Sequence, residues 1–268
     1  MPPSPFRPPK NLRFLYNEYM IPQLVIFDMD GTLTESKSVA DTEMVELLRT
    51  LLQKTTVAVI SGGAMARFEE QLLVSFLGDT SHFENFYLAT LNGGILYSHK
   101  GVTWEKIYEE VLSDDEKQKI ADAFKKTFEE TGFKPEATIY GMLIEDRGGQ
   151  VTFSGLGSEA PLELKKMWDP DRTKRTILVE ELKKHLPEFE VRMGGTTSID
   201  ISHKGIDKAY GVEKLSEHLS ISISEMLFIG DALYPGGNDE AAKRTGIETR
   251  EVVGPEDTKK IIKELLKG

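Results

Sequence analysis

The 268-residue chain contains no cysteine, and this absence excludes disulfide bonds, metal sites built from thiolates and cysteine nucleophiles. No apolar run approaches the roughly 18 residues that a membrane-spanning helix requires, and the N-terminus lacks the apolar stretch of a secretory signal. Basic residues are outnumbered, because 33 Lys and Arg face 44 Asp and Glu, for a net charge of −11. This charge disfavours binding to nucleic acid or to an anionic membrane. We therefore expect a cytoplasmic protein with neither partner.

The sequence does contain a regular alternation of apolar runs and helical patterns. Apolar runs at 23–28 and 56–60 predict buried strands, and further strands are predicted at 86–91, 225–230 and 248–253. Amphipathic helical patterns separate several of these runs. Strands that alternate with helices indicate a parallel sheet, so the expected fold class is α/β with a Rossmann-like core.

The middle of the chain has a different pattern. Ser113 is placed to cap a helix over 114–130, and a second helix is predicted over 171–186. The turn Asp146-Arg-Gly-Gly149 joins two strand-like segments into a hairpin, and Gly194-Gly195 joins two more. Two helices and four strands joined by tight turns predict a small α+β unit.

These patterns predict one domain interrupted by another. The expected organisation is an N-terminal extension over 1–20, a core domain made of 21–97 and 204–268, and an inserted cap domain over 98–203. The sequence shows no internal repeat and no low-complexity segment.

The sharpest chemical signal is Asp28-Met-Asp30-Gly31, which directly follows the first predicted strand. Catalytic groups of α/β sheets lie just beyond the carboxyl ends of the strands, and Gly31 permits a tight turn that brings Asp30 back toward Asp28. Two carboxylates so close repel each other unless a cation lies between them. The pair therefore indicates Mg²⁺ bound by oxygen ligands, one carboxylate that attacks phosphorus and one that transfers protons. A lone Asp-x-Asp-Gly is also compatible with a simple turn.

The segment from Asp28 to Thr34 resembles motif I of the haloacid-dehalogenase (HAD) phosphotransferases. Ser61 stands where motif II of that superfamily has a phosphoryl-binding hydroxyl, and Lys208 stands where motif III has a lysine. Gly230-Asp231 resembles motif IV. The resemblance implies that the catalytic residues are Asp28, Asp30, Ser61 and Lys208, and that the Mg²⁺ ligands are Asp28, Asp30, Asp231, Asn238 and Asp239.

The resemblance extends to one subgroup of that superfamily. An insertion between motifs II and III is typical of the C2-type cap of sugar-phosphate enzymes. Gly230–Asp239 and Gly254–Thr258 resemble the eukaryotic-type phosphomannomutases, as does Gly194–Asp200, whose serine and aspartate contact the sugar phosphate in that family. The substrate-binding residues that this implies are Gly62, Asn92, Arg147, Ser158, Lys165, Ser198 and Asp200. A homodimer formed through the cap is a further analogy with these mutases.

One departure from the mutase pattern bears on the reaction. Those mutases clamp the non-reacting phosphate with several cap arginines, and here Arg147 keeps one of them. Ser158 and Lys165 stand at two other arginine positions, and neither side chain binds phosphate in the bidentate manner of arginine. An alternative source of charge is a group of basic residues on a nearby stretch of the cap, which are Lys165, Lys166, Arg172, Lys174 and Arg175.

The weakened clamp favours a phosphatase that acts on a small phosphorylated sugar or related metabolite. The alternative is a phosphomannomutase-type phosphohexomutase that interconverts hexose 1- and 6-phosphates. Two non-enzymatic alternatives fit less well. A phospho-accepting signalling domain needs no cap, and a sugar-phosphate sensor needs no retained Asp28, Asp30, Lys208 and Asp231.

Overall fold

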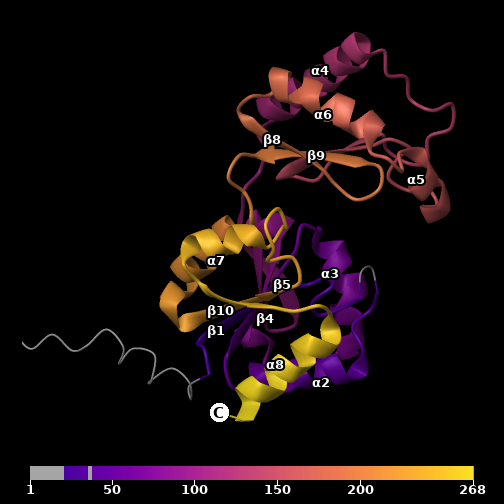
Figure 1. The fold of residues 1–268 in the computed structure, drawn as a ribbon. Helices are drawn as coiled ribbons and strands as arrows, with labels where there is room; N and C mark the ends of the chain where they lie inside the picture. Colours follow the sequence, from indigo (N-terminus) through magenta and orange to yellow (C-terminus); the bar gives the residue numbers. More distant parts are fainter. Residues whose placement is uncertain (1–20, 36–37, 268) are drawn as a thin grey trace, which may run out of the picture.

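The computed structural model describes residues 21–35 and 38–267, which form two units, each built on its own sheet (Figure 1). The lower unit in Figure 1 holds both ends of the described chain and is called the core. The upper unit is inserted into the core and is called the cap. The predicted extension over 1–20 lies outside the described residues.

The core is built on a seven-stranded sheet with the strand order β11-β10-β1-β2-β3-β4-β5. Neighbouring strands from β11 to β3 run parallel, whereas β4 and β5 run antiparallel at one edge. The strand bounds are β1 Leu24–Asp28, β2 Thr56–Ile60, β3 Phe86–Thr90, β4 Ile95–Lys100, β5 Thr103–Glu109, β10 Met226–Gly230 and β11 Glu248–Glu251. All five residues of β1 are buried, because β1 lies at the centre of a sheet covered on both faces.

Helices cover both faces of this sheet. One face packs α2, α3 and α8 against alternate side chains of the central strands, among them Phe27 and Val59. The opposite face packs α7 against the other set, among them Ile26 and Ile60. The helix bounds are α2 Thr42–Leu52, α3 Met65–Gln71, α7 Lys208–Leu219 and α8 Pro255–Lys267. The carboxyl ends of β1, β2 and β10 are left to face the cap (Figure 1).

The cap is a four-stranded antiparallel sheet in the order β6-β7-β9-β8. Its bounds are β6 Ile144–Asp146, β7 Gln150–Ser154, β8 Phe189–Met193, β9 Ser198–His203, α4 Asp114–Thr131, α5 Leu162–Trp168 and α6 Thr173–His185. Helices α4 and α6 lie on the face of the sheet that points away from the core (Figure 1). The predicted cap on α4 is present, since Ser113 and Glu116 form a reciprocal capping box.

The predicted start of the cap at residue 98 is wrong. Strand β4 pairs with β3, and β5 pairs with β4, so the chain leaves the core sheet only after Glu109. Tyr97 and Trp104 pack against the core cluster on one face of that sheet. The hairpin was missed because Lys100 and Gly101 break the apolar pattern just where the chain reverses direction.

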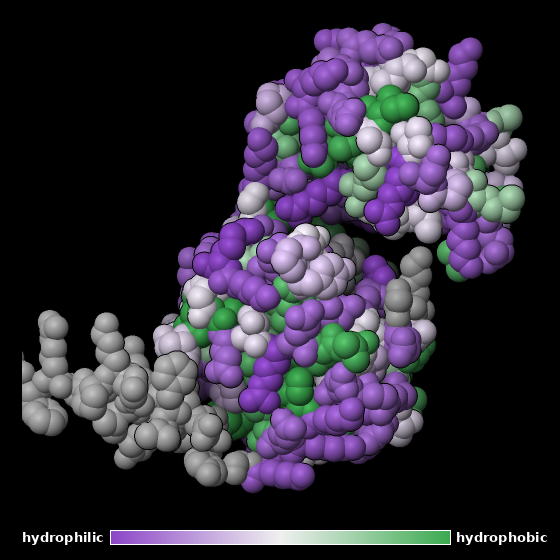
Figure 2. All heavy atoms as spheres, in the orientation of Figure 1, coloured by the Kyte–Doolittle hydropathy of each residue, from purple (hydrophilic) through white to green (hydrophobic). Residues whose placement is uncertain are grey.

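Two smaller differences concern the cap. Helix α5 was not predicted, and the first strand of the predicted hairpin is short, because it covers only Ile144–Asp146. The face shown in Figure 2 is mostly hydrophilic and is hollowed between cap and core. Among the helices that the structure describes, none has the length and apolarity needed to cross a membrane.

Candidate active site

Asp28 ends the central strand β1 and is only 3% exposed. The chain turns sharply after it, and Gly31 has a φ of +80°, a left-handed conformation that glycine adopts without strain. A Cβ atom at residue 31 would collide with the carboxylate of Asp231, which follows β10. Glycine at this turn therefore lets the loops after β1 and β10 approach each other, so that Asp28 and Asp231 come together.

Asp28, Asp231 and Asp239 form an acidic cluster at the carboxyl edge of the sheet. One carboxylate oxygen of each lies within 4.8 Å of the others. Asp239 is completely buried, and it accepts a hydrogen bond from the backbone N–H of Ala232 at 2.9 Å. The loop after β10 is thereby folded back onto β1, which completes the cluster.

Lys208 is the first residue of α7, and it reaches this cluster from the face of the sheet that α7 covers. Its Nζ donates to Asp28 Oδ1 at 2.5 Å and also donates to Asp239 Oδ1. The lysine is 1% exposed, and a lone charge buried this deeply would be strongly unfavourable. Burial opposes its charge, but the carboxylates of Asp28 and Asp239 outweigh burial and hold the pKa of Lys208 above its usual value.

The carboxylates respond in the opposite sense. Burial raises the pKa of Asp28 to about 6, although the neighbouring Lys208 works against this rise. Burial and the nearby Asp239 also raise the pKa of Asp231. Since one lysine balances only one of three carboxylates, the cluster retains an excess of negative charge.

The composition of this cluster fits a magnesium ion. All three side chains offer carboxylate oxygens, the ligands that a hard divalent cation prefers, and the cluster lacks the positive charge that such a cation would supply. The structure places Asp28, Asp231 and Asp239 together as predicted. The predicted Asn238 lies beside them on the cleft wall. The side chain of Asp30, in contrast, lies outside the cluster of mutually close ligand atoms.

Asp30 points instead toward α3. Arg67 Nη2 lies 2.8 Å from Asp30 Oδ1 in a partly exposed ion pair. This contact was not predicted, because nothing in the sequence around Arg67 distinguishes it from any other helix-surface arginine. Asp30 therefore stands beside the acidic cluster, on the side where the cleft opens, rather than within it.

Three predicted residues form the floor of the cleft next to Asp28. Ser61 follows β2 and is 3% exposed, and its Oγ accepts a weak hydrogen bond from the N–H of Gly63 at 3.3 Å. Asn92 donates its backbone N–H to the carbonyl of Ser61 at 2.9 Å, which joins the loops after β2 and β3. Ser61, Gly62 and Asn92 all line the cleft.

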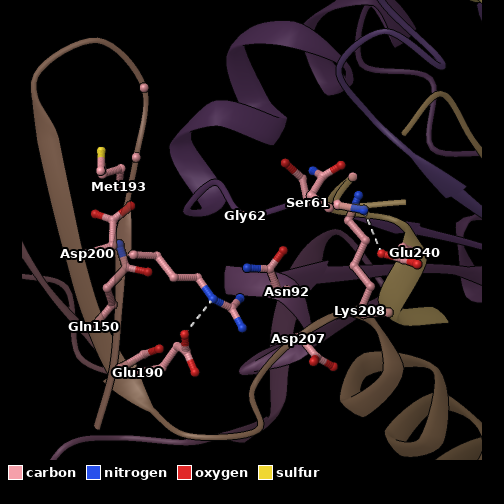
Figure 3. Close-up of a pocket in the computed structure, with 18 of the residues that line it drawn as sticks. Ser61, Gly62, Asn92, Gln150, Glu190, Met193, Asp200, Asp207, Lys208 and Glu240 are labelled. Carbon is pink, nitrogen blue, oxygen red and sulfur yellow. Dashed lines mark hydrogen bonds and ion pairs between the residues drawn. The ribbon is translucent and has the colours of Figure 1, made fainter. Parts of the chain in front are cut away.

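The cleft lies between cap and core and has a volume of about 1250 Å³. Figure 3 shows Asp200, Gln150 and Glu190 on the cap side, and Ser61, Asn92 and Lys208 on the core side. A space of this size, with the buried Asp28 at one end and cap side chains opposite, is large enough for a small phosphorylated metabolite.

The predicted cap residues fall into two groups. Asp200 lines the cleft, and Ser198 lies next to it against Gly194. Arg147, Ser158 and Lys165 do not line it. Arg147 donates hydrogen bonds from both Nε and Nη2 to Glu145 Oε2, at 2.8 and 2.6 Å. Lys165 Nζ donates a hydrogen bond to the carbonyl of Ser158 at 2.9 Å.

Other charged cap residues that were not predicted do line the cleft. Arg192 and Glu190, neighbours on one face of β8, form an ion pair of 3.2 Å there, and Lys183 of α6 lies along the same wall. The alternation of apolar and charged residues along β8 is the only sequence signal that Glu190 and Arg192 lie on the same face of this strand. A second group of potential metal ligands lies away from the cleft and consists of Glu130, Glu181 and His185. Its two carboxylates form ion pairs with surface lysines. We interpret that group as a surface ion-pair network.

Known proteins match this chain in sequence over most of its length. The family model for eukaryotic phosphomannomutase matches residues 44–268. The phosphomannomutase of Arabidopsis thaliana is 29% identical over 249 residues, which covers 88% of this chain and 93% of that protein. The phosphomannomutase of Saccharomyces cerevisiae is 29% identical over 250 residues and covers 90% and 93%.

Solved structures match the fold at lower identity. Trehalose-6-phosphate phosphatase from Aspergillus fumigatus aligns with a TM-score of 0.61 and 18% identity over 97% of this chain and 99% of that one. A haloacid dehalogenase-like hydrolase from Bacteroides thetaiotaomicron gives 0.63 and 17% identity over 91% and 99%. IMP-nucleotidase from Plasmodium falciparum gives 0.67 and 16% identity over 95% of this chain and 64% of that one.

These comparisons confirm the predicted α/β fold with an inserted cap and the predicted resemblance to HAD phosphotransferases. They show an enzyme, either a phosphatase or a phosphohexomutase, and they favour the mutase alternative over the phosphatase that the incomplete arginine clamp predicts. Because the family model spans residues 44–268, the chain belongs to the eukaryotic phosphomannomutase family.

Proposed function

We propose that this protein is a magnesium-dependent phosphohexomutase that moves a phosphoryl group between the 1- and 6-positions of a hexose phosphate through an aspartyl-phosphate on Asp28. The observation that supports this most directly is the buried contact between Asp28 and Lys208 at the base of the cleft between cap and core. An ionised carboxylate beside a buried lysine is suited to attack phosphorus. Family membership supplies the substrate class.

Asp28 would act as the nucleophile. Its Oδ attacks the phosphorus of the bound ester, a new O–P bond forms on Asp28, and the bond from phosphorus to the sugar oxygen breaks. Burial raises the pKa of Asp28, but the neighbouring Lys208 opposes the rise and favours the ionised carboxylate that attacks phosphorus. Lys208 offsets negative charge on the transferring group, which reduces the repulsion between Asp28 and phosphate.

Asp30 and Ser61 would serve the same step from either side. Asp30 would remove a proton from the hydroxyl that accepts the phosphoryl group, and it would return that proton to the sugar oxygen that leaves when Asp28 is phosphorylated again. Ser61 would donate a hydrogen bond from its hydroxyl to a phosphoryl oxygen, because the hydrogen bond from Gly63 N–H holds Ser61 Oγ at the cleft floor. Both side chains line the cleft beside Asp28.

Asp28, Asp231 and Asp239 would hold the Mg²⁺ ion, with Asn238 beside them. When bound, the ion supplies positive charge that stabilises the phosphoryl oxygens and relieves the repulsion among the three carboxylates. The chain itself fixes the ligand positions, through Gly31 at one turn and the Asp239–Ala232 hydrogen bond at the other.

A phosphatase is the second candidate function, and one observation favours it. A mutase must hold the non-reacting phosphate in the cap, yet Arg147 is bonded to Glu145, and Ser158 and Lys165 lie off the cleft. If the cap holds that phosphate weakly, water replaces the sugar hydroxyl as the acceptor. The predicted substrate, a small phosphorylated sugar, is the same for both reactions.

One experiment separates the two. The protein is incubated with Mg²⁺, mannose 1-phosphate and a catalytic amount of hexose 1,6-bisphosphate, and both hexose 6-phosphate and free phosphate are measured. Formation of 6-phosphate without stoichiometric phosphate release supports the mutase, whereas phosphate release without 6-phosphate supports the phosphatase. The Asp28→Asn variant is the control and should form neither product. Product formation by that variant at the wild-type rate would contradict both.

A further inference from the structure

Arg175 is a buried cation for which the proposed chemistry has no use. It is one of the basic cap residues that offer an alternative phosphate clamp, but its side chain is only 3% exposed and does not line the cleft. Burying a guanidinium is costly unless every donor finds a partner. Its contacts therefore indicate what the charge is for.

Those contacts join the start of α6 to the turn between β8 and β9. Arg175 Nε donates to Asp169 Oδ2 at 2.8 Å, while Nη1 donates to the carbonyl oxygens of Gly194 and Gly195 at 2.9 and 2.7 Å. Asp169 is also buried, and its carboxylate accepts hydrogen bonds from the backbone N–H groups of Lys174 and Arg175. The ion pair is thus anchored to the first turn of α6 and holds the Gly194–Gly195 turn by its backbone.

The Gly194–Gly195 turn forms part of the cleft wall. Gly194 donates its N–H to the carbonyl of Ser198 at 3.0 Å, and a Cβ atom at residue 194 would collide with Ser198 Oγ and with the Asp200 carboxylate. The backbone of the turn therefore packs directly on two side chains that are implied to contact the sugar phosphate. A movement of the turn would displace both of them.

Asp200 is supported from its other side as well. Thr152 Oγ1 donates to Asp200 Oδ1 at 2.8 Å, and Gln150 Nε2 donates to Thr152 Oγ1 at 2.9 Å. Figure 3 shows Asp200 and Gln150 on the cap side of the cleft, facing the core. A carboxylate held between these two supports presents its remaining lone pairs in a fixed direction, as recognition of a hydroxyl-rich ligand requires.

We propose that Arg175 is a positioning residue for substrate recognition: paired with Asp169, it fixes the Gly194–Gly195 turn and thereby sets Ser198 and Asp200 for contact with the sugar hydroxyls and phosphate. This inference rests on the proposed function. Arginine suits the task because one rigid, planar group reaches a carboxylate and two carbonyl oxygens at once. Lysine would carry the same charge but could not reproduce this geometry.

The test compares two phosphoryl donors in wild type and in Arg175→Lys. Mannose 1-phosphate is large enough to touch the cap, whereas acetyl phosphate engages mainly the core. We expect the substitution to raise KM for mannose 1-phosphate about tenfold, the effect of losing one charge-assisted hydrogen bond, with kcat and the turnover of acetyl phosphate within about twofold. Asp169→Asn should shift KM in the same direction, and Lys184→Ala, which removes an exposed charge from the same helix, should change nothing.

Three results would overturn the proposal. They are an unchanged KM for mannose 1-phosphate in Arg175→Lys, an equal loss with both donors, and a shift of equal size in Lys184→Ala. An equal loss would show a general structural role, and the melting temperature of each variant would be measured alongside. If the wild type turns over neither donor, the proposed function fails. Arg175 is then tested by calorimetric binding of mannose 6-phosphate, where an unchanged affinity in Arg175→Lys would overturn the positioning role.

Discussion

Arg67 Nη2 lies 2.8 Å from Asp30 Oδ1, so the second aspartate of the motif-I pair is held by α3 and not by the acidic cluster that contains the first. The arrangement separates two neighbouring carboxylates by function. Asp28 belongs to the buried acidic cluster, whereas Asp30 faces the open cleft, where a leaving or attacking oxygen would stand.

Replacement of Arg67 by Ala should therefore disturb the proton-transferring carboxylate selectively. We expect kcat for mannose 1-phosphate to fall by about 10- to 100-fold, since general acid–base assistance contributes roughly 10²- to 10⁴-fold. Acetyl phosphate, whose leaving group needs no proton, should lose much less. Steady-state kinetics with both donors measures this. Arg67→Lys should restore part of the rate, and equal losses with the two donors would refute the selective effect.

Magnesium should stabilise the folded protein. The ion binds the native acidic cluster, which the unfolded chain lacks, so the melting temperature should rise with Mg²⁺ concentration according to mass action. In Asp231→Asn the rise should largely disappear, because one of the three carboxylates is gone. Thermal unfolding at several Mg²⁺ concentrations tests this. As the matched control, Asp146→Asn removes a cap carboxylate that pairs with Lys117 and is not part of the cluster, and it should keep the full rise.

Asp200→Asn should make the protein more stable at neutral pH while it weakens substrate binding. Burial raises the pKa of Asp200 above its ordinary value of 3.8, although hydrogen bonding from Thr152 works against the rise. Below pH 3.8 the group is protonated in both the folded and the unfolded chain, and its ionisation costs nothing. As the pH increases beyond that value, the unfolded chain gives up the proton more readily, so folded-state stability is lost.

The variant removes this cost, because the Asn oxygen can still accept the hydrogen bond from Thr152. We expect a melting temperature at pH 7.5 that is higher by at least about 2 °C, and little difference near pH 3.5. Melting curves at the two pH values provide the measurement. A stabilisation of the same size at both would show that ionisation of Asp200 is not its cause.

Lys208→Ala should destabilise the protein as well as abolish turnover. Removal of the lysine leaves Asp28 and Asp239 buried without a counter-ion, and breaking a buried ion pair costs about 3–5 kcal/mol. The free energy of unfolding is obtained from urea titration in EDTA. The double variant Lys208→Met/Asp28→Asn should recover part of the stability, and failure to do so would contradict the proposed pairing.

Much of the fold could be predicted because it depends on local patterns. Four of the five parallel strands of the core, β1, β2, β3 and β10, are short apolar runs, and Asp28, Ser61, Asn92 and Asp231 stand at or just after their carboxyl ends. The edge hairpin of β4 and β5 was missed because its pairing with β3 is a tertiary contact without a clear turn signature. The start of the cap was consequently placed too early.

The acidic cluster was predicted more completely than the cap wall. Asp28, Lys208, Asp231 and Asp239 stand at fixed places relative to strands and helices, so the sequence motif predicts their meeting. The role of Arg175 could not be predicted, because the sequence does not show whether its side chain turns toward the protein interior or toward solvent. The same holds for Arg67, whose partner lies 37 residues away in the chain.

The central claim is that a phosphoryl group passes through Asp28, and trapping that intermediate tests it most directly. Protein incubated with Mg²⁺ and mannose 1-phosphate or hexose 1,6-bisphosphate is acid-quenched, reduced with borohydride and mapped by mass spectrometry. The account predicts conversion of residue 28 from aspartate to homoserine, dependent on substrate and absent in Asp28→Asn. Rapid product formation with residue 28 unmodified, or with the label at Asp30 or Asp231 instead, would contradict it.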